Sequence, residues 1–135
     1  MTEMQSRSAM HVRTATPEDV PSVLNITDGA LLQVEISSLK SAIESHAVLV
    51  AVTGEEDEER LLGALVLDGS EITALAVRRR RRGQGIGTTL VEAAAERRDE
   101  LVAEFDERVE AFWQSAGFDV TTLQGSNRYR GRLKP

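Results

Sequence analysis

The chain has 135 residues, a length that suits one compact domain with a single sheet-centred core. It has no cysteine, which excludes disulfides, thiolate metal sites and a cysteine nucleophile, and its two histidines make a histidine-rich metal site a poor hypothesis. The net charge of -6 disfavours binding to duplex nucleic acid. Because the sequence has neither an apolar run of roughly 20 residues nor the apolar core of a signal peptide, we expect a cytoplasmic protein without membrane contact.

The first nine residues, 1–9, have no structural pattern and are expected to be disordered, which leaves one domain over 10–135. Met10–Ala15 can form a first strand. Thr16 then fits the N-cap of a helix, because Pro17 follows at the first helical position and an acid stands two residues later. A second short helix is predicted over residues 35 to 45 from the spacing of its apolar side chains, Ile36, Leu39 and Ile43.

Two apolar segments then have the pattern of strands, Ala47–Thr53 and Leu61–Leu67. The connection between them, G-E-E-D-E-E-R, contains five acids that cannot be buried unpaired, so we expect a solvated hairpin loop. A third strand is predicted over Glu71–Val77. The C-terminal part continues with a strand at Leu101–Phe105, a helix over 107–116 closed by a glycine, and a hairpin made of two further segments, Phe118–Leu123 and Asn127–Leu133.

Between these parts lies a basic, glycine-rich turn. Five arginines, Arg78–Arg82, follow the third strand, and glycines stand at positions 83, 85 and 87. From Ile86 the apolar residues recur at helical spacing, which predicts a helix to about Arg98. The first turn of a helix has N–H groups without intrahelical partners and carries roughly half a positive charge, and glycines let an anion approach them closely. Strand, glycine turn and helix together predict a phosphate-binding loop.

Two common phosphate loops fit this turn poorly. A Walker loop ends in Gly-Lys-Ser/Thr, whereas this turn has Gly87-Thr88 and no lysine. A dinucleotide fingerprint needs G-x-G-x-x-G followed by an acid at the right distance, and this turn has the pattern G-x-G-x-G. The order of elements, β-α-α-β-β-β-α-β-α-β-β, predicts an α/β protein with a mixed sheet covered by helices.

The segment Arg82-x-x-Gly85-x-Gly87, preceded by a strand that ends in Leu75-Ala76-Val77, resembles the acyl-CoA signature of the GNAT superfamily of N-acetyltransferases. A second segment, A-F-W-Q-S-A-G-F at 111–118, is similar to the family's A-x-x-F-Y-x-x-x-G-F segment at the expected distance downstream. The resemblance extends over nearly the whole chain. It implies the GNAT fold and transfer of acetyl from acetyl-CoA to a primary amine by direct attack.

The resemblance also implies a coenzyme site. Main-chain groups of Leu75, Ala76 and Val77 would bind the pantetheine arm between two splayed strands, and a strand N–H near Val77 would stabilise the oxyanion. The pyrophosphate would lie on the N–H groups of the glycine loop, which comprises Arg82, Gly83, Gln84, Gly85, Ile86, Gly87 and Thr88. Trp113 would line the thiol end of the cleft. No metal is implied.

The resemblance also suggests candidates for the catalytic base and acid. Glu71 stands where some family members carry a glutamate base, and strict alternation would put it on the same face of its strand as Leu75 and Val77. The family's usual tyrosine acid is replaced by Trp113, whose indole N–H is a poor proton donor for a thiolate, and Asp106 stands where an asparagine is common. Three possibilities then remain: water protonates the departing thiolate, Tyr129 does so, or the enzyme is slow.

Two alternatives remain open from the sequence. A non-catalytic acyl-CoA-binding or regulatory module would fit the missing tyrosine, and a nucleic-acid binder would fit the arginine run. The acetyltransferase hypothesis requires acetyl-CoA and an amine acceptor as partners, in a monomer or homodimer. Three acids in or near the N-terminal helices, Asp28, Glu35 and Glu44, are candidates to attract a cationic amine.

Overall fold

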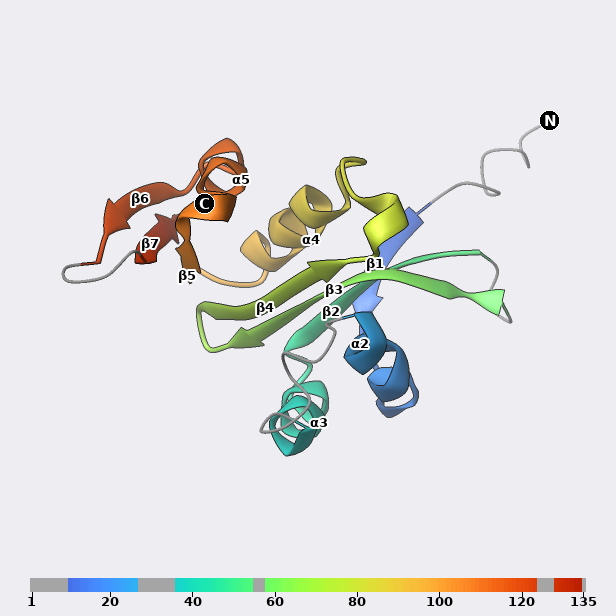
Figure 1. Ribbon diagram of the computed structural model, residues 1–135. Coiled ribbons are helices and arrows are strands. Elements are labelled where there is room, and N and C mark those ends of the chain that lie inside the picture. Colours follow the sequence, from blue (N-terminus) through green and yellow to red (C-terminus); the bar gives the residue numbers. More distant parts are fainter. Residues whose placement is uncertain (1–9, 27–35, 55–57, 124–127, 135) are drawn as a thin grey trace.

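The computed structural model describes residues 10–26, 36–54, 58–123 and 128–134, and the expected disorder of 1–9 lies outside them. Within these ranges, seven strands form one sheet in the order β1-β2-β3-β4-β5-β7-β6 (Figure 1). Neighbouring strands are antiparallel except β4 and β5, which are parallel. The predicted mixed sheet is therefore confirmed. Its strands are β1 (Met10–Thr14), β2 (Val48–Thr53), β3 (Arg60–Asp68), β4 (Glu71–Val77), β5 (Leu101–Asp106), β6 (Asp119–Thr122) and β7 (Arg128–Leu133).

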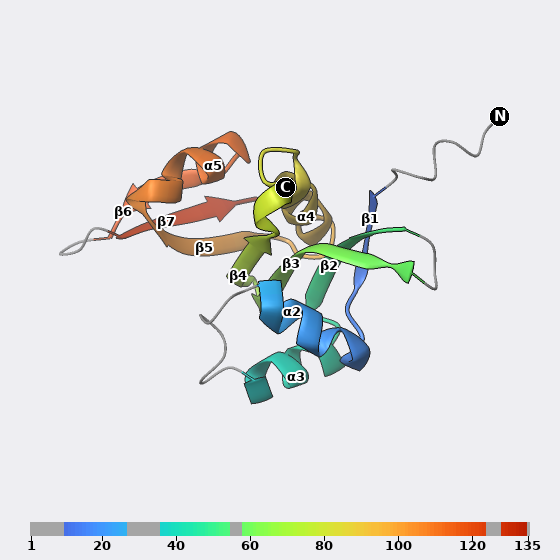
Figure 2. The same cartoon turned by 45° about the vertical axis from the view of Figure 1, so that its right-hand side comes forward.

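Helices cover both faces of the sheet. Two of them, α2 (Val20–Ile26) and α3 (Ile36–Glu44), lie on one face, and α4 (Ile86–Ala95) lies on the other (Figures 1 and 2). A short helix, α5 (Glu110–Ser115), packs beside β6 and β7. In the described part of the chain, 3-10 turns precede or connect these helices, namely η1 (Pro17–Asp19), η3 (Arg79–Arg81) and η4 (Glu107–Val109).

The core consists of one apolar cluster on each face of the sheet. Leu49, Leu65 and Leu90 belong to the cluster under α4, and Val23 and Val50 belong to the cluster under α2 and α3. Strands β2 and β3 are buried along almost their whole length because helices cover them on both sides. This explains why their sequences are continuous apolar runs instead of alternating ones. No helix within the described ranges is long and apolar enough to span a membrane.

Two predicted helices differ from the observed ones. The helix predicted to reach about Arg98 ends at Ala95, because the chain turns there and the Arg98 Nε–H donates to the Gly69 carbonyl oxygen at 2.8 Å. The helix predicted over 107–116 is divided into η4 and α5. The Asp106 carboxylate caps η4 by accepting from the Arg108 N–H at 2.9 Å.

The corner between β1 and α2 contains a partly buried ion network. Arg13 donates to Asp19 at 2.9 Å and to Glu59 at 2.7 Å. Burial by itself raises the pKa of the Asp19 carboxyl, but hydrogen bonds from Arg13 and Thr16 outweigh it and hold that pKa below its usual range. Glu59 was expected to belong to a solvated loop and is instead paired, whereas the preceding residues 55–57 lie outside the described part of the chain.

Candidate active site

The candidate site lies where β4 and β5 separate. The two strands pair only through Glu71 with Val102 and Ile72 with Ala103, at the start of each strand. Strand β4 stays paired with β3 as far as Val77. The separation leaves a cleft of about 800 Å³, which we call the β4–β5 cleft. It extends from the start of α4 to Ile26 at the end of α2, so it reaches both faces of the sheet.

The register of β3 and β4 decides which main-chain groups face this cleft. Arg78 donates its N–H to the Leu62 carbonyl oxygen at 2.8 Å, which makes these two residues a hydrogen-bonded pair. Because bonded and non-bonded pairs alternate in an antiparallel ladder, Ala76 also bonds to β3, opposite Ala64. The N–H and C=O groups of Leu75 and Val77 therefore point the other way, into the cleft.

This register refines the sequence-based expectation for the pantetheine arm. Of the three residues predicted to offer main-chain groups, Leu75 and Val77 direct theirs into the cleft, whereas those of Ala76 are used in pairing with β3. The Val77 carbonyl also accepts from the Arg82 Nε–H at 3.2 Å, which anchors the glycine loop to the end of the strand.

A bulge in β4 changes the expected position of Glu71. The register shifts between Val66 and Leu67 of β3, so Thr73 is an extra residue in β4. As a consequence Ile72 packs in the same core cluster as Leu75 and Val77, under α4, and Glu71 lies on the opposite face. The expectation that Glu71 shares a face with Leu75 and Val77 is therefore wrong. Glu71 is exposed and is not among the residues that line the cleft.

The glycine loop has the backbone geometry that close approach of an anion requires. Gly83 and Gly85 have φ angles of +80° and +85°, and a Cβ built on either would meet no atom within 4 Å. Gly85 is also the N-cap of α4, so the free N–H groups of the first turn follow it. Every residue of the loop lines the β4–β5 cleft except Gln84, which is exposed.

Two other glycines bring the layers together. A Cβ at Gly87 would lie 3.3 Å from the Phe112 ring, so this glycine lets α4 approach α5. Gly63 of β3, whose role no local sequence pattern indicates, lies opposite Val77 and under Ile86, where an added Cβ would be 3.2 Å from the Ile86 side chain. These close approaches set the position of the glycine loop relative to the sheet.

Aromatic side chains form the wall of the cleft on the β5 side. Trp113 is 6% exposed and stacks on Phe105 with ring centroids 5.4 Å apart, and both rings line the cleft. Trp113 therefore belongs to the core and to the cleft wall together. Tyr129 stacks on the Phe105 ring at 6.2 Å and does not itself line the cleft.

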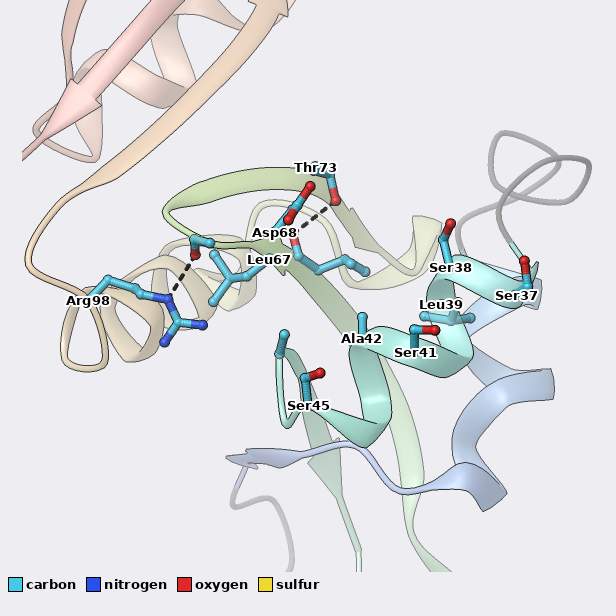
Figure 3. A pocket seen from close by; sticks show the side chains of 13 residues that line it. Ser37, Ser38, Leu39, Ser41, Ala42, Ser45, Leu67, Asp68, Thr73 and Arg98 are labelled. Atoms are coloured by element: carbon cyan, nitrogen blue, oxygen red, sulfur yellow. Dashed lines mark hydrogen bonds between the residues drawn. The ribbon is translucent and has the colours of Figure 1, made fainter.

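A second hollow of about 580 Å³, here called the serine groove, lies between α3 and the β3–β4 hairpin (Figure 3). Serine side chains project from α3 along it, and Asp68 and Arg98 stand at its hairpin end (Figure 3). Thr73 lines both this groove and the β4–β5 cleft, so the two hollows meet at the bulge. Within the described residues, no group of three or more His, Cys, Asp or Glu side chains could hold a metal ion.

Comparison with known proteins adds a family and a set of similar folds. A family model for the acetyltransferase (GNAT) domain matches residues 44–120. No curated protein sequence matches the chain significantly. The solved structures compared below are less than 25% identical to this chain in sequence, so they show only that the fold is similar.

Three solved structures illustrate this likeness. A GNAT-family acetyltransferase from Bacillus cereus ATCC 10987 has a TM-score of 0.70 at 14% identity, over 94% of this chain and 96% of that one. Rv2747 from Mycobacterium tuberculosis, in complex with CoA and NLQ, has a TM-score of 0.73 at 18% identity, over 93% and 99%. The NatC complex bound to Gag peptide and CoA gives 0.73 at 20% identity, over 93% and 98%.

Proposed function

Because the chain belongs to the GNAT acetyltransferase family, we propose that it transfers acetyl from acetyl-CoA to a primary amine in the β4–β5 cleft. The observation that carries this proposal is the cleft itself. A parallel strand pair that separates after two residues leaves a row of unpaired main-chain groups beside a glycine loop and a helix N-terminus. Two of the similar structures were solved with CoA, which supports a coenzyme of this class.

The residues of the glycine loop fit a diphosphate. Gly83 and Gly85 leave open space where side chains would otherwise stand, and the ten-residue helix α4 directs its free N–H groups there. The Arg82 Nε–H donates to the Val77 carbonyl oxygen, and the other guanidinium N–H groups can donate to a phosphate oxygen. We assign the coenzyme's diphosphate to this loop.

The exposed edge of β4 fits the rest of the coenzyme. Acetyl-CoA supplies a thioester whose carbonyl carbon is open to attack by a neutral amine. The N–H groups of Leu75 and Val77 face the cleft, where they can bind the pantetheine arm and stabilise negative charge on the acyl oxygen. The stacked rings of Phe105 and Trp113 give the far wall of the cleft an apolar surface.

Glu71 remains our proposed base, in a different arrangement from the one expected. It lies on the α2–α3 face of β4, on the other side of the strand from Ile72. An amine that enters from that face could pass its proton to Glu71 through water. The indole N–H of Trp113 is a poor proton donor, and Tyr129 does not line the cleft. We therefore propose that the departing thiolate takes its proton from water.

The experiment that tests this function is a screen of primary amines and peptides with acetyl-CoA, followed by detection of free thiol. The proposed function predicts thiol release that depends on the acceptor. The replacement of the usual tyrosine by Trp113 favours one alternative, a non-catalytic acyl-CoA-binding module. That alternative predicts tight coenzyme binding without thiol release for any amine in the panel.

A further inference from the structure

Six arginines surround a third hollow, which we call the arginine bowl. It has a volume of about 610 Å³ and is lined by Arg60 at the start of β3, by Arg78–Arg82 after β4, and by Asn25 and Ile26 at the end of α2. The glycine positions of the phosphate loop do not line it. The bowl is therefore a concentration of positive charge that shares Arg82 with the coenzyme cleft but none of the loop glycines.

The guanidinium groups of the bowl have no acidic partner among the described residues. Of the ion pairs in that part of the chain, none includes Arg60 or any of Arg78–Arg82. Two of the six are anchored to the main chain, since Arg78 donates its Nε–H to the Leu61 carbonyl oxygen and Arg82 donates to that of Val77. Like charges held around a hollow repel one another, and a bound anion would relieve that repulsion.

The bowl is placed where an acceptor would meet the coenzyme. Ile26, Val77 and Arg82 line both the bowl and the β4–β5 cleft, so the two hollows join at the end of β4. Asn25 and Ile26 bring the end of α2 to the bowl, whereas the glycine loop lies at the start of α4. With the diphosphate on the glycine loop, the bowl is left for a different anion.

We propose that the arginine bowl binds an anionic group, a carboxylate or a phosphate, of the amine acceptor, so that the substrates of this enzyme are amines that carry negative charge. This inference rests on the proposed function. It replaces the expectation that Asp28, Glu35 and Glu44 attract a cationic amine. Of these three acids, Asp28 and Glu35 lie outside the described residues.

The kinetic test compares matched amines: phosphoethanolamine against ethanolamine, and 4-aminobutyrate against its amide. We expect kcat/KM to be at least about tenfold higher for the anionic member of each pair, because a charge-assisted hydrogen bond is worth this much or more. In the Arg60→Gln variant the anionic-to-neutral ratio should fall about tenfold. Arg60 is exposed and lies outside the coenzyme loop, so the substitution should leave folding intact.

The matched control is Arg97→Gln, an exposed arginine just beyond α4 that loses the same charge outside the bowl and should keep the wild-type ratio. Equal kcat/KM for anionic and neutral amines, or an unchanged ratio in Arg60→Gln, would overturn the proposal. So would an equal fall of the ratio in Arg97→Gln, since the effect would then come from net charge alone.

A direct binding measurement separates this proposal from the proposed function. Calorimetric titration of the CoA-saturated protein with inorganic phosphate should show binding that weakens about tenfold in Arg60→Gln. If this holds while no amine releases thiol, the anion site stands and the acetyltransferase assignment fails. If phosphate binds only when dephospho-CoA replaces CoA, the bowl holds the coenzyme's own 3'-phosphate and the acceptor assignment is wrong. Absence of phosphate binding with either coenzyme also overturns it.

Discussion

The two ends of β4 show how one strand can serve both the core and a ligand. At its start, Glu71 and Ile72 pair with β5 on one side and with β3 on the other. At its end, Leu75 and Val77 have only β3 as a neighbour, and their main-chain groups face the cleft. An unpaired strand edge inside a protein normally binds another strand. Here we propose that the coenzyme takes that place, so binding depends more on backbone than on side chains.

The largest expected effect comes from placing a negative charge in the glycine loop. Gly85→Glu should weaken CoA binding about 10³-fold, because its carboxylate would lie where we assign the diphosphate and would displace several charge-assisted hydrogen bonds. Calorimetry measures this directly. The matched control is Gly69→Glu in the β3–β4 hairpin, where φ is also positive at +62° and an added Cβ also meets no atom within 4 Å.

The control should cost similar backbone strain and leave CoA affinity within about twofold of the wild type, as expected of a surface site away from the ligand. Unchanged affinity in Gly85→Glu would move the diphosphate to another place. An equal loss in both variants would show that strain or net charge, and not the loop, causes the effect.

Proline substitutions sharpen the contrast between neighbouring residues of β4. Val77→Pro removes an N–H that faces the cleft and should lower kcat by about 10²-fold, the usual effect of removing one donor that stabilises the oxyanion. Ala76→Pro removes an N–H that bonds to β3 and should lower the free energy of unfolding by about 3 kcal/mol. Denaturant unfolding and steady-state kinetics measure the two effects. Val77→Ala controls for loss of the valine side chain, and equal destabilisation by both prolines would contradict the register argument.

Glu71→Gln tests the paired end of the strand. If Glu71 accepts the acceptor's proton through water, the variant should lose about 10²-fold in kcat/KM, and the acid limb of the pH-rate profile should disappear. Glu92→Gln, an exposed acid on α4 away from β4, is the control. A wild-type pH-rate profile in Glu71→Gln would remove this residue from the mechanism.

The smallest effect concerns stability far from the cleft. The Asp19 carboxyl has a lowered pKa in the folded protein, so it contributes stability that is present above its usual pKa and is lost as the pH falls through the folded value. Asp19→Asn should therefore lower the free energy of unfolding by about 1 kcal/mol at neutral pH and flatten its decrease below about pH 4. Unfolding curves measured across this pH range show the difference in stability. The substitution should leave CoA affinity unchanged.

Local patterns in the sequence predicted most of the fold. The apolar runs of β2 and β3, the helical spacing of Leu39 and Ile43, and the glycines around Gly85 each specify their structure within a few residues, and all appear where expected. The order of these elements then predicts a mixed sheet covered by helices. Anion binding by the loop is also predicted, because closely spaced glycines directly before a helix leave its free N–H groups accessible to a ligand, and it stays a prediction.

What the sequence did not predict depends on pairing between distant segments. The bulge at Thr73 arises from the register of β3 against β4, and it reverses the face on which Glu71 lies. The pairing of Glu59 with Arg13 and the joining of Arg60 to the arginine run bring together residues far apart in the chain. Periodicity within one segment contains no information about such contacts, so the arginine bowl could not be anticipated. The separation of β4 from β5 was expected only from the resemblance to the GNAT family.

The most direct test of the coenzyme assignment is amide hydrogen exchange along β4, measured by NMR with and without CoA. We predict that the Leu75 and Val77 amides exchange rapidly in the free protein and become protected when CoA binds, whereas the Ala76 amide is protected in both states by its bond to β3. Unchanged exchange at Leu75 and Val77 in the presence of saturating CoA would contradict the assignment of the coenzyme to the β4–β5 cleft.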